Sequence, residues 1–112
     1  MMDVGDDRMN MESRDTGASG EDVIRIHIWF SGRVQGVFFR HHTEKKAREL
    51  GVYGWVMNLP DGRVEAVFEG KKEDVEELLE YCSKRQPLAW VEGVETTEET
   101  PEGLRTFVRK HG

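Results

Sequence analysis

The sequence contains very little cysteine and no long apolar run. Its one cysteine, Cys82, excludes an intramolecular disulfide framework and fits a reducing compartment. No apolar stretch approaches the roughly 18 residues that a membrane-spanning helix needs, and the N-terminus has no apolar segment of the secretory type. We therefore expect a cytoplasmic protein that does not enter a membrane.

Positive charge is also in short supply. The chain of 112 residues has 16 Lys and Arg against 22 Asp and Glu, which gives a formal net charge of −6. Nucleic-acid-binding proteins usually carry a basic surface, so this balance argues against nonspecific binding of nucleic acid. An anionic ligand would have to be held by a local positive site, because the overall field would not attract it.

A chain of this length is expected to form one domain. Residues 1–20 hold almost no branched apolar side chains and are rich in Asp, Gly, Ser and Met. Such a segment cannot bury enough apolar surface to offset the entropy of ordering. We predict a disordered N-terminal tail over residues 1–20 and a folded domain over residues 21–112.

Two amphipathic helices are predicted from apolar residues at helical spacing. One face of the first, residues 39–50, is formed by Phe39, Thr43, Ala47 and Leu50. Gly51 is suited to end this helix. The apolar face of the second, residues 72–84, is formed by Val75, Leu78, Leu79 and Cys82. We expect Cys82 to be a buried helix residue rather than a reactive thiol.

A strand beginning at Val23 is predicted by alternation with a period of two. The apolar positions of this run are Ile24, Ile26, Ile28 and Phe30. His27 falls on the opposite face, where we expect it to be solvated. Residues 52–58 and 63–69 are predicted to be two further strands. Pro60 and the Asp61-Gly62 pair between them indicate a tight antiparallel connection.

The last strands are predicted over residues 90–96 and 106–109. Val91 and Val94 break strict alternation in the first, which indicates a bulge or a different register, and Phe107 anchors the second. The order is strand, helix, strand, strand, helix, strand, with a short additional C-terminal strand. It predicts an α+β, ferredoxin-like βαββαβ sandwich with two helices on one face of an antiparallel sheet.

A glycine-bracketed loop between the first strand and the first helix has the features of an anion site. Its residues are Gly32, Arg33, Val34, Gln35, Gly36, Val37 and Phe38, and Arg40 follows in the helix. Glycine permits a concave backbone, and N–H groups beside a helix start can bind an anion. The planar guanidinium of Arg40 suits phosphate oxygens. The alternative is that the glycines serve a turn alone.

Asn58, at the end of the predicted strand 52–58, is a candidate for orienting water. Its amide can donate and accept hydrogen bonds at once, although asparagine at a strand end is usually a turn residue. The adjacent His41 and His42 point in different directions from a helix and lack a matching Cys or carboxylate cluster, so no metal site is predicted. Trp55 and Trp90 are interpreted as packing residues.

The glycine-bracketed loop and Arg40 are followed eighteen positions later by Asn58, within Gly54-Trp55-Val56-Met57-Asn58. In this combination residues 23–109 resemble the acylphosphatase family, including its βαββαβ order. The resemblance implies hydrolysis of the carboxyl–phosphate bond of acyl phosphates, without a metal. By motif position, it implies that Arg40 binds the phosphate, that Asn58 orients the water and that residues 32–38 form the phosphate-binding loop.

The same resemblance implies no cofactor and no metal. The implied partners are a small acyl phosphate as substrate and inorganic phosphate as product. We expect no nucleic-acid or membrane partner, and we expect a monomer. Phe38 is a bulky residue at a variable motif position, where it would shape the acyl side of the pocket.

Three other functions are weighed against this one. A non-enzymatic anion-binding module on the same fold would bind phosphate and leave an acyl phosphate intact. An RNA-binding domain of similar topology is disfavoured by the net charge and by the missing aromatic and basic sheet-face motif. The acylphosphatase-like part of a larger carbamoyl-phosphate-processing hydrogenase maturation protein is disfavoured because no further domain or zinc-finger cysteine follows Gly112.

Overall fold

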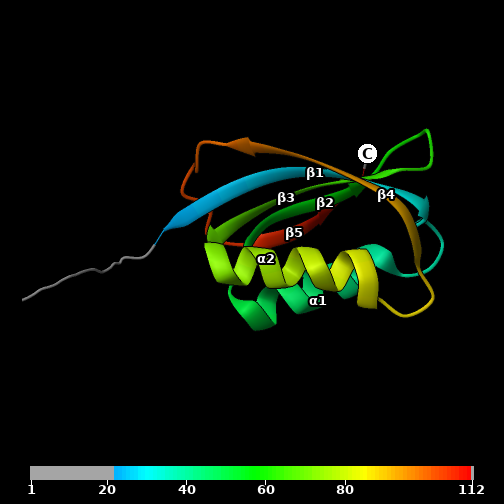
Figure 1. Ribbon diagram of the computed structural model, residues 1–112, viewed down its shortest axis with the longest axis horizontal. Coiled ribbons are helices and arrows are strands. Elements are labelled where there is room, and N and C mark those ends of the chain that lie inside the picture. The colour runs from blue at the N-terminus through cyan, green and yellow to red at the C-terminus, as the bar shows by residue number, and fades with distance from the viewer. Residues whose placement is uncertain (1–21, 112) are drawn as a thin grey trace, which may run out of the picture.

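The computed structural model describes residues 22–111, and the predicted tail over residues 1–20 lies outside them. Five strands and two helices follow one another in these residues (Figure 1). The elements are β1 (Val23–Arg33), α1 (Phe39–Leu50), β2 (Tyr53–Asn58), β3 (Val64–Lys71), α2 (Lys72–Glu80), the π-helical turn η1 (Tyr81–Arg85), β4 (Trp90–Glu99) and β5 (Phe107–Lys110). The predicted helices and strands are confirmed, with bounds that differ by a few residues.

The strands form a single sheet in the order β4-β1-β3-β2-β5. β1 pairs antiparallel with both β3 and β4, and β2 pairs antiparallel with β3. The short β5 pairs with β2 in the parallel direction, so the complete sheet is mixed rather than wholly antiparallel. Figure 1 shows α1 and α2 side by side against one face of the sheet. This arrangement confirms the ferredoxin-like fold.

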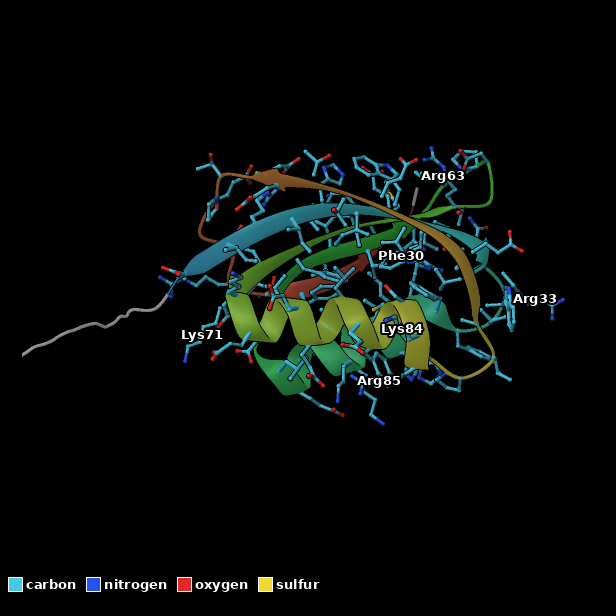
Figure 2. The ribbon with its side chains drawn as sticks, viewed as in Figure 1. Phe30, Arg33, Arg63, Lys71, Lys84 and Arg85 are labelled. Atoms are coloured by element: carbon cyan, nitrogen blue, oxygen red, sulfur yellow. The ribbon has the colours of Figure 1, made fainter. Side chains whose placement is uncertain are left out.

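The core lies between the sheet and the helices, as the apolar periodicities predict. Phe30 and Phe39 are each about 1% exposed or less, and their ring centroids lie 5.0 Å apart. Figure 2 shows Phe30 in this layer, whereas Lys71 and Arg85 point outward. Burial of each large apolar side chain contributes roughly 1.5–3 kcal/mol to folding. Thr43 is buried with Phe39 and Ala47 on one face of α1, and Cys82 is buried in η1, which directly follows α2.

Residues on the other side of the sheet, which we call the open face, differ from expectation. His27 is not solvated: its side chain is 19% exposed and lies between Glu65 and Glu99. Its ring stacks on Trp29 with centroids 4.2 Å apart. The reason is that long polar and aromatic side chains of three adjacent strands cover one another, so the open face carries a second, polar packing layer.

Two smaller features of β4 bear on the sequence predictions. The predicted irregularity is confirmed as a bulge, because the register shifts between Ser31 and Gly32 of β1. The prediction that Trp90 packs is wrong, since this side chain is 70% exposed at the beginning of β4. Trp55 does pack, with its ring edge-on to His27 and the Lys110 ammonium 4.4 Å from its centroid.

Candidate active site

The glycine-bracketed loop leaves β1 through two residues with left-handed backbone angles. Gly32 has φ 114°, and a Cβ atom there would collide with the Trp90 carbonyl oxygen. Gly36 has φ 76° with open space around it, so it is required for its backbone angles alone. Gly32 is therefore a site of close approach between β1 and β4, whereas Gly36 shapes the loop itself.

Phe38 ends this loop in an unusual conformation. It has φ 63° and ψ 26°, the left-handed region that non-glycine residues rarely enter, and it immediately precedes α1. Its side chain is 68% exposed, while the next residue, Phe39, is buried. The sharp turn thus anchors the helix start in the core through Phe39. The first N–H groups of a helix lack intrahelical partners and are available to an anion.

Gln35 joins the loop to the β2–β3 hairpin. Its Nε2 donates hydrogen bonds of 2.8 Å to the carbonyl oxygens of both Leu59 and Arg63. The Leu59 N–H in turn donates to the Arg63 carbonyl over 2.8 Å. Because Leu59 directly follows Asn58, the Gln35 side chain fixes the position of Asn58 relative to the loop. This positioning contact was not predicted from the sequence.

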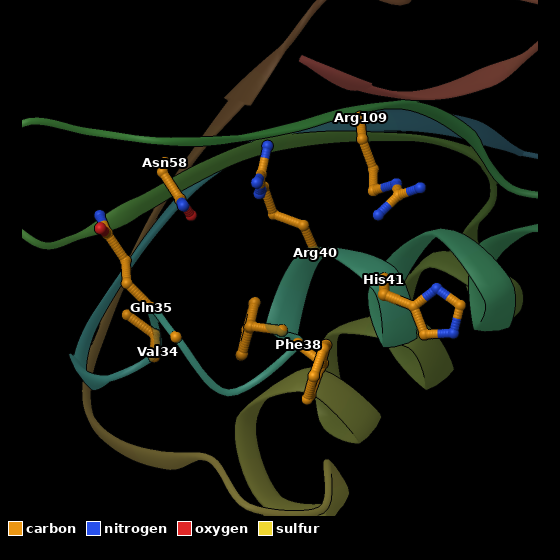
Figure 3. Close-up of a pocket in the computed structure, with 9 residues that line it drawn as sticks. Val34, Gln35, Phe38, Arg40, His41, Asn58 and Arg109 are labelled. Carbon is orange, nitrogen blue, oxygen red and sulfur yellow. The ribbon is translucent and has the colours of Figure 1, made fainter. Parts of the chain in front are cut away.

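Arg40 lies in the first turn of α1, and its side chain is held by β5, the strand at one edge of the sheet. Its Nη1 donates to the Lys110 carbonyl oxygen of β5 over 2.9 Å. Such a contact orients the guanidinium without neutralising its charge, because a carbonyl oxygen carries no net charge. Figure 3 shows Arg40 and Asn58 turned toward each other across one cavity.

This cavity has a volume of about 230 Å³. Its lining residues are Val34, Gln35, Gly36, Phe38, Phe39, Arg40, His41, Asn58 and Arg109. The structure therefore brings most of the predicted loop together with both predicted catalytic side chains. Gly32, Arg33 and Val37 are not among the lining residues, and their assignment to substrate binding stays a prediction.

Arg109 is a cavity residue that the sequence prediction missed. It lies in β5, where its Nε forms a 2.9 Å ion pair with Oε1 of Glu44 from α1. The available signal was the alternation of the last strand, since Phe107 is buried against the helices and Arg109 shares its face. Without a known partner for that strand, the alternation could not place Arg109 in the same cavity as Arg40 and Asn58.

The remaining candidate groups are Cys82, His41 and His42. Cys82 is buried, and burial raises the pKa of its thiol to about 12, so it is an inert core residue. His41 lines the cavity and stacks edge-on with His42, but residues 22–111 contain no cluster of three His, Cys, Asp or Glu side chains suited to a metal. In the same residues, no helix is both long and apolar enough to cross a membrane.

Comparison with known proteins yields consistent matches. The model of the family described as acylphosphatase matches residues 26–108. An acylphosphatase of Synechococcus sp. (strain JA-2-3B'a(2-13)) is 56% identical over 86 residues, which cover 77% of this chain and 92% of the relative.

Solved structures give the same picture. The structure of an acylphosphatase from Coxiella burnetii superimposes with a TM-score of 0.76 at 37% identity, covering 82% of this chain and 99% of that one. T. kodakarensis HypF matches with a TM-score of 0.70 at 37% identity, covering 79% of this chain but 12% of that one. A similar domain therefore also occurs within a much longer protein.

Proposed function

Because this chain belongs to the acylphosphatase family and is an enzyme that acts on acyl phosphates, we propose that its cavity binds the phosphoryl group through Arg40 and the loop 32–38, and that Asn58 orients the attacking water. The substrate is a small acyl phosphate and one product is inorganic phosphate. The single observation that carries the proposal is the convergence of Arg40 and Asn58 on one cavity beside the start of α1 (Figure 3).

The phosphoryl group is held by charge and by backbone geometry. The Arg40 guanidinium presents two parallel donors to phosphoryl oxygens, and its link to the Lys110 carbonyl keeps it in the cavity. N–H groups of the loop and of the first turn of α1 supply further donors. Charge that spreads over the phosphoryl oxygens in a loose transition state is stabilised by these same groups.

Asn58 acts on the water. Its carboxamide offers a carbonyl oxygen that accepts from the water and an NH₂ group that donates to the phosphoryl oxygens. The Gln35 bridge to Leu59 and Arg63 fixes the hairpin that carries Asn58, so the amide is placed before substrate binds. Such preorganisation lowers the entropic cost of bringing water in line with the bond that breaks.

The hydrolysis step balances without a protein acid or base. The water oxygen forms a bond to phosphorus, and the bond between phosphorus and the acyl oxygen breaks with its electron pair left on the carboxylate. A carboxylate is a weak base, so it departs without taking a proton. The proton released by the water passes to a phosphoryl oxygen of the substrate. Neither Cys82, which is buried, nor a metal cluster is required.

The test is phosphate release from acetyl phosphate in excess EDTA, with the wild-type enzyme beside Arg40→Ala and Asn58→Ala. The proposal expects activity that persists in the chelator and is lost in both variants. Activity that disappears in EDTA and returns with added divalent metal would contradict the metal-free mechanism. Full activity in either variant would remove that residue from the mechanism.

We also propose that the enzyme is a cytoplasmic monomer whose catalytic domain spans residues 21–112, without residues 1–20. The buried Cys82 thiol is consistent with a reducing compartment. Light scattering of the full chain, and kcat after removal of residues 1–20, test the two structural statements.

A further inference from the structure

Arg109 lies at the end of the cavity away from the water-orienting side chain. β5 runs parallel to β2 with Arg109 opposite Val56, and Asn58 lies two residues beyond Val56 on the same, helix-facing side of the sheet. Figure 3 shows Arg40 between the two, with Asn58 on one side and Arg109, above His41, on the other. A ligand held by Arg40 therefore has Asn58 at one end and Arg109 at the other.

In-line displacement places the attacking water and the leaving group on opposite sides of phosphorus. If Asn58 holds the water, the acyl group departs from the far side of the phosphoryl group. That side is where Arg109 lines the cavity. The geometry therefore puts a guanidinium beside the acyl part of the substrate and not beside the phosphoryl oxygens.

Positive charge exceeds negative charge around Arg109. Glu44 binds both guanidiniums near it, through Oε1 to Arg109 Nε and through Oε2 to Arg48 Nη2, each over 2.9 Å. One carboxylate is thus shared by two arginines, of which Arg109 lines the cavity, and Arg40 adds a second guanidinium to the cavity lining. The Arg109 side chain remains 46% exposed, so it can reach a ligand. In a chain with a net charge of −6, this is a local concentration of positive charge.

Resting on the proposed function, we propose that Arg109 makes this enzyme selective for acyl phosphates whose acyl group carries a second anionic group. A carboxylate or a second phosphate on that group would pair with the Arg109 guanidinium, which suits both oxyanions. Acyl phosphates with a neutral acyl group would react through Arg40 and Asn58 alone. Arg109 is then a specificity-determining residue, and it takes no part in bond breaking.

The experiment compares kcat/KM for acetyl phosphate, which has no second anion, with kcat/KM for succinyl phosphate, which has a carboxylate. In Arg109→Gln we expect about a tenfold loss on succinyl phosphate, mainly as a rise in KM, the scale of one charge-assisted contact. The loss on acetyl phosphate should be smaller, about twofold. Arg109→Lys should fall between, because an ammonium keeps the charge without the planar fork.

One further variant is a matched control, and a second should strengthen the effect of Arg109. Arg48→Gln removes a guanidinium from the same Glu44 but does not border the cavity, so the ratio between the two substrates should stay within about twofold. Glu44→Gln frees Arg109 from its competing carboxylate and should raise kcat/KM for succinyl phosphate a few-fold. The wild-type preference for succinyl phosphate over acetyl phosphate should also shrink as salt is raised. Salt weakens the attraction between exposed charges, and the Debye length, roughly 10 Å at 0.1 M, shortens further at higher concentration.

An acyl phosphate with a second phosphate, in place of the carboxylate, distinguishes the two anion types. Loss of kcat/KM in Arg109→Gln on either anionic substrate, well beyond that on acetyl phosphate, supports the proposal. Equal loss on all three substrates, or no loss on any, overturns it. If the wild-type enzyme hydrolyses none of the three substrates, the proposed function itself fails, which separates the two results. A circular dichroism melt of each variant shows that it is folded.

Discussion

The helix-facing cavity and the open face of the sheet both carry arginines, but the two regions treat their charge differently. Arg40 is bound by a neutral carbonyl oxygen, and Arg109 shares one carboxylate with Arg48. On the open face, Arg25 is 7% exposed and bonds directly to Glu69 and Glu99. We call an arginine matched when it has carboxylates of its own, as Arg25 has, and under-matched when it has a neutral partner or shares one carboxylate. A matched arginine stabilises the fold, whereas an under-matched arginine beside a cavity is available to a ligand.

Glu69 is the centre of the matched group. Its carboxylate accepts hydrogen bonds from the backbone N–H groups of Glu102, Gly103 and Leu104 over 3.0, 2.7 and 3.0 Å, as well as from Arg25 over 3.2 Å. These contacts attach the connection between β4 and β5 to the sheet. The open face therefore holds in place the strand that carries Arg109 and the carbonyl that orients Arg40.

The comparison predicts that losing an under-matched charge removes activity and leaves stability intact. Arg40→Ala should lower kcat/KM by about 10³-fold or more, because no other group replaces its fork on the phosphoryl group. Arg40→Lys should also fail badly. Phosphate release and inhibition by inorganic phosphate measure the effect. The matched control is Arg85→Ala, an exposed arginine paired with Glu77, which should behave as the wild type.

Asn58→Ala also tests the helix-facing cavity, where a substitution should lower activity and not stability. We expect a loss of roughly 10²-fold in kcat, the scale of one positioned polar group, with little change in the affinity for phosphate. Steady-state kinetics on acetyl phosphate separate the two parameters. An unchanged kcat with a raised KM would show that Asn58 binds the substrate and does not orient the water.

On the open face we expect the reverse, namely that a substitution lowers stability and leaves activity largely intact. Glu69→Ala leaves the buried Arg25 guanidinium and three backbone N–H groups without their acceptor, so unfolding free energy should fall by about 3 kcal/mol. Urea denaturation measures it, with the exposed Glu73→Ala as control. Specific activity per folded molecule should remain within a few-fold of the wild type. A large loss of activity at full stability would break the comparison.

The smallest effect concerns pH. Burial alone would raise the pKa of Glu69, but the hydrogen bonds from Glu102, Leu104 and Gly103 and from Arg25 outweigh it, so the pKa lies below its ordinary value of 4.5. The stabilisation from this carboxylate is therefore complete above pH 4.5 and is lost as pH falls through the lower, folded-state pKa. Glu69→Gln should be less stable at neutral pH and should lose less stability on acidification. Thermal melts between about pH 7 and pH 3 check this.

Local patterns were sufficient for most of the fold. The spacing of Phe39, Thr43 and Ala47 predicted α1, and Gly51 predicted its end, because helix periodicity is a property of neighbouring residues. Arg40 and Asn58 were predicted from the loop and strand motifs that carry them. The order and direction of β5 were not, since a four-residue strand contains too little pattern to identify its partner.

Contacts between distant positions could not be predicted in the same way. The partners of Arg25 lie 44 and 74 positions away in the sequence, and His27 by itself has the pattern of an exposed strand residue. Gln35 lies in the loop that was predicted to bind phosphate, yet its side-chain amide donates hydrogen bonds to carbonyl oxygens of the β2–β3 hairpin. In each case the role of the side chain depends on which distant segment lies next to it. Local patterns in a single sequence do not identify that neighbour.

The two outermost strands of the sheet have opposite character. β4 forms one border with ten residues that include Glu92, Glu95, Glu98 and Glu99, and β5 forms the other with four residues that include Arg109 and Lys110. Two copies meeting through the same border would bring like charges together, which disfavours the strand-to-strand joining that begins fibril growth. Joining of unlike borders is limited by the four-residue length of β5. The acidic composition of this chain thus also protects its longest unpaired backbone edge from polymerisation.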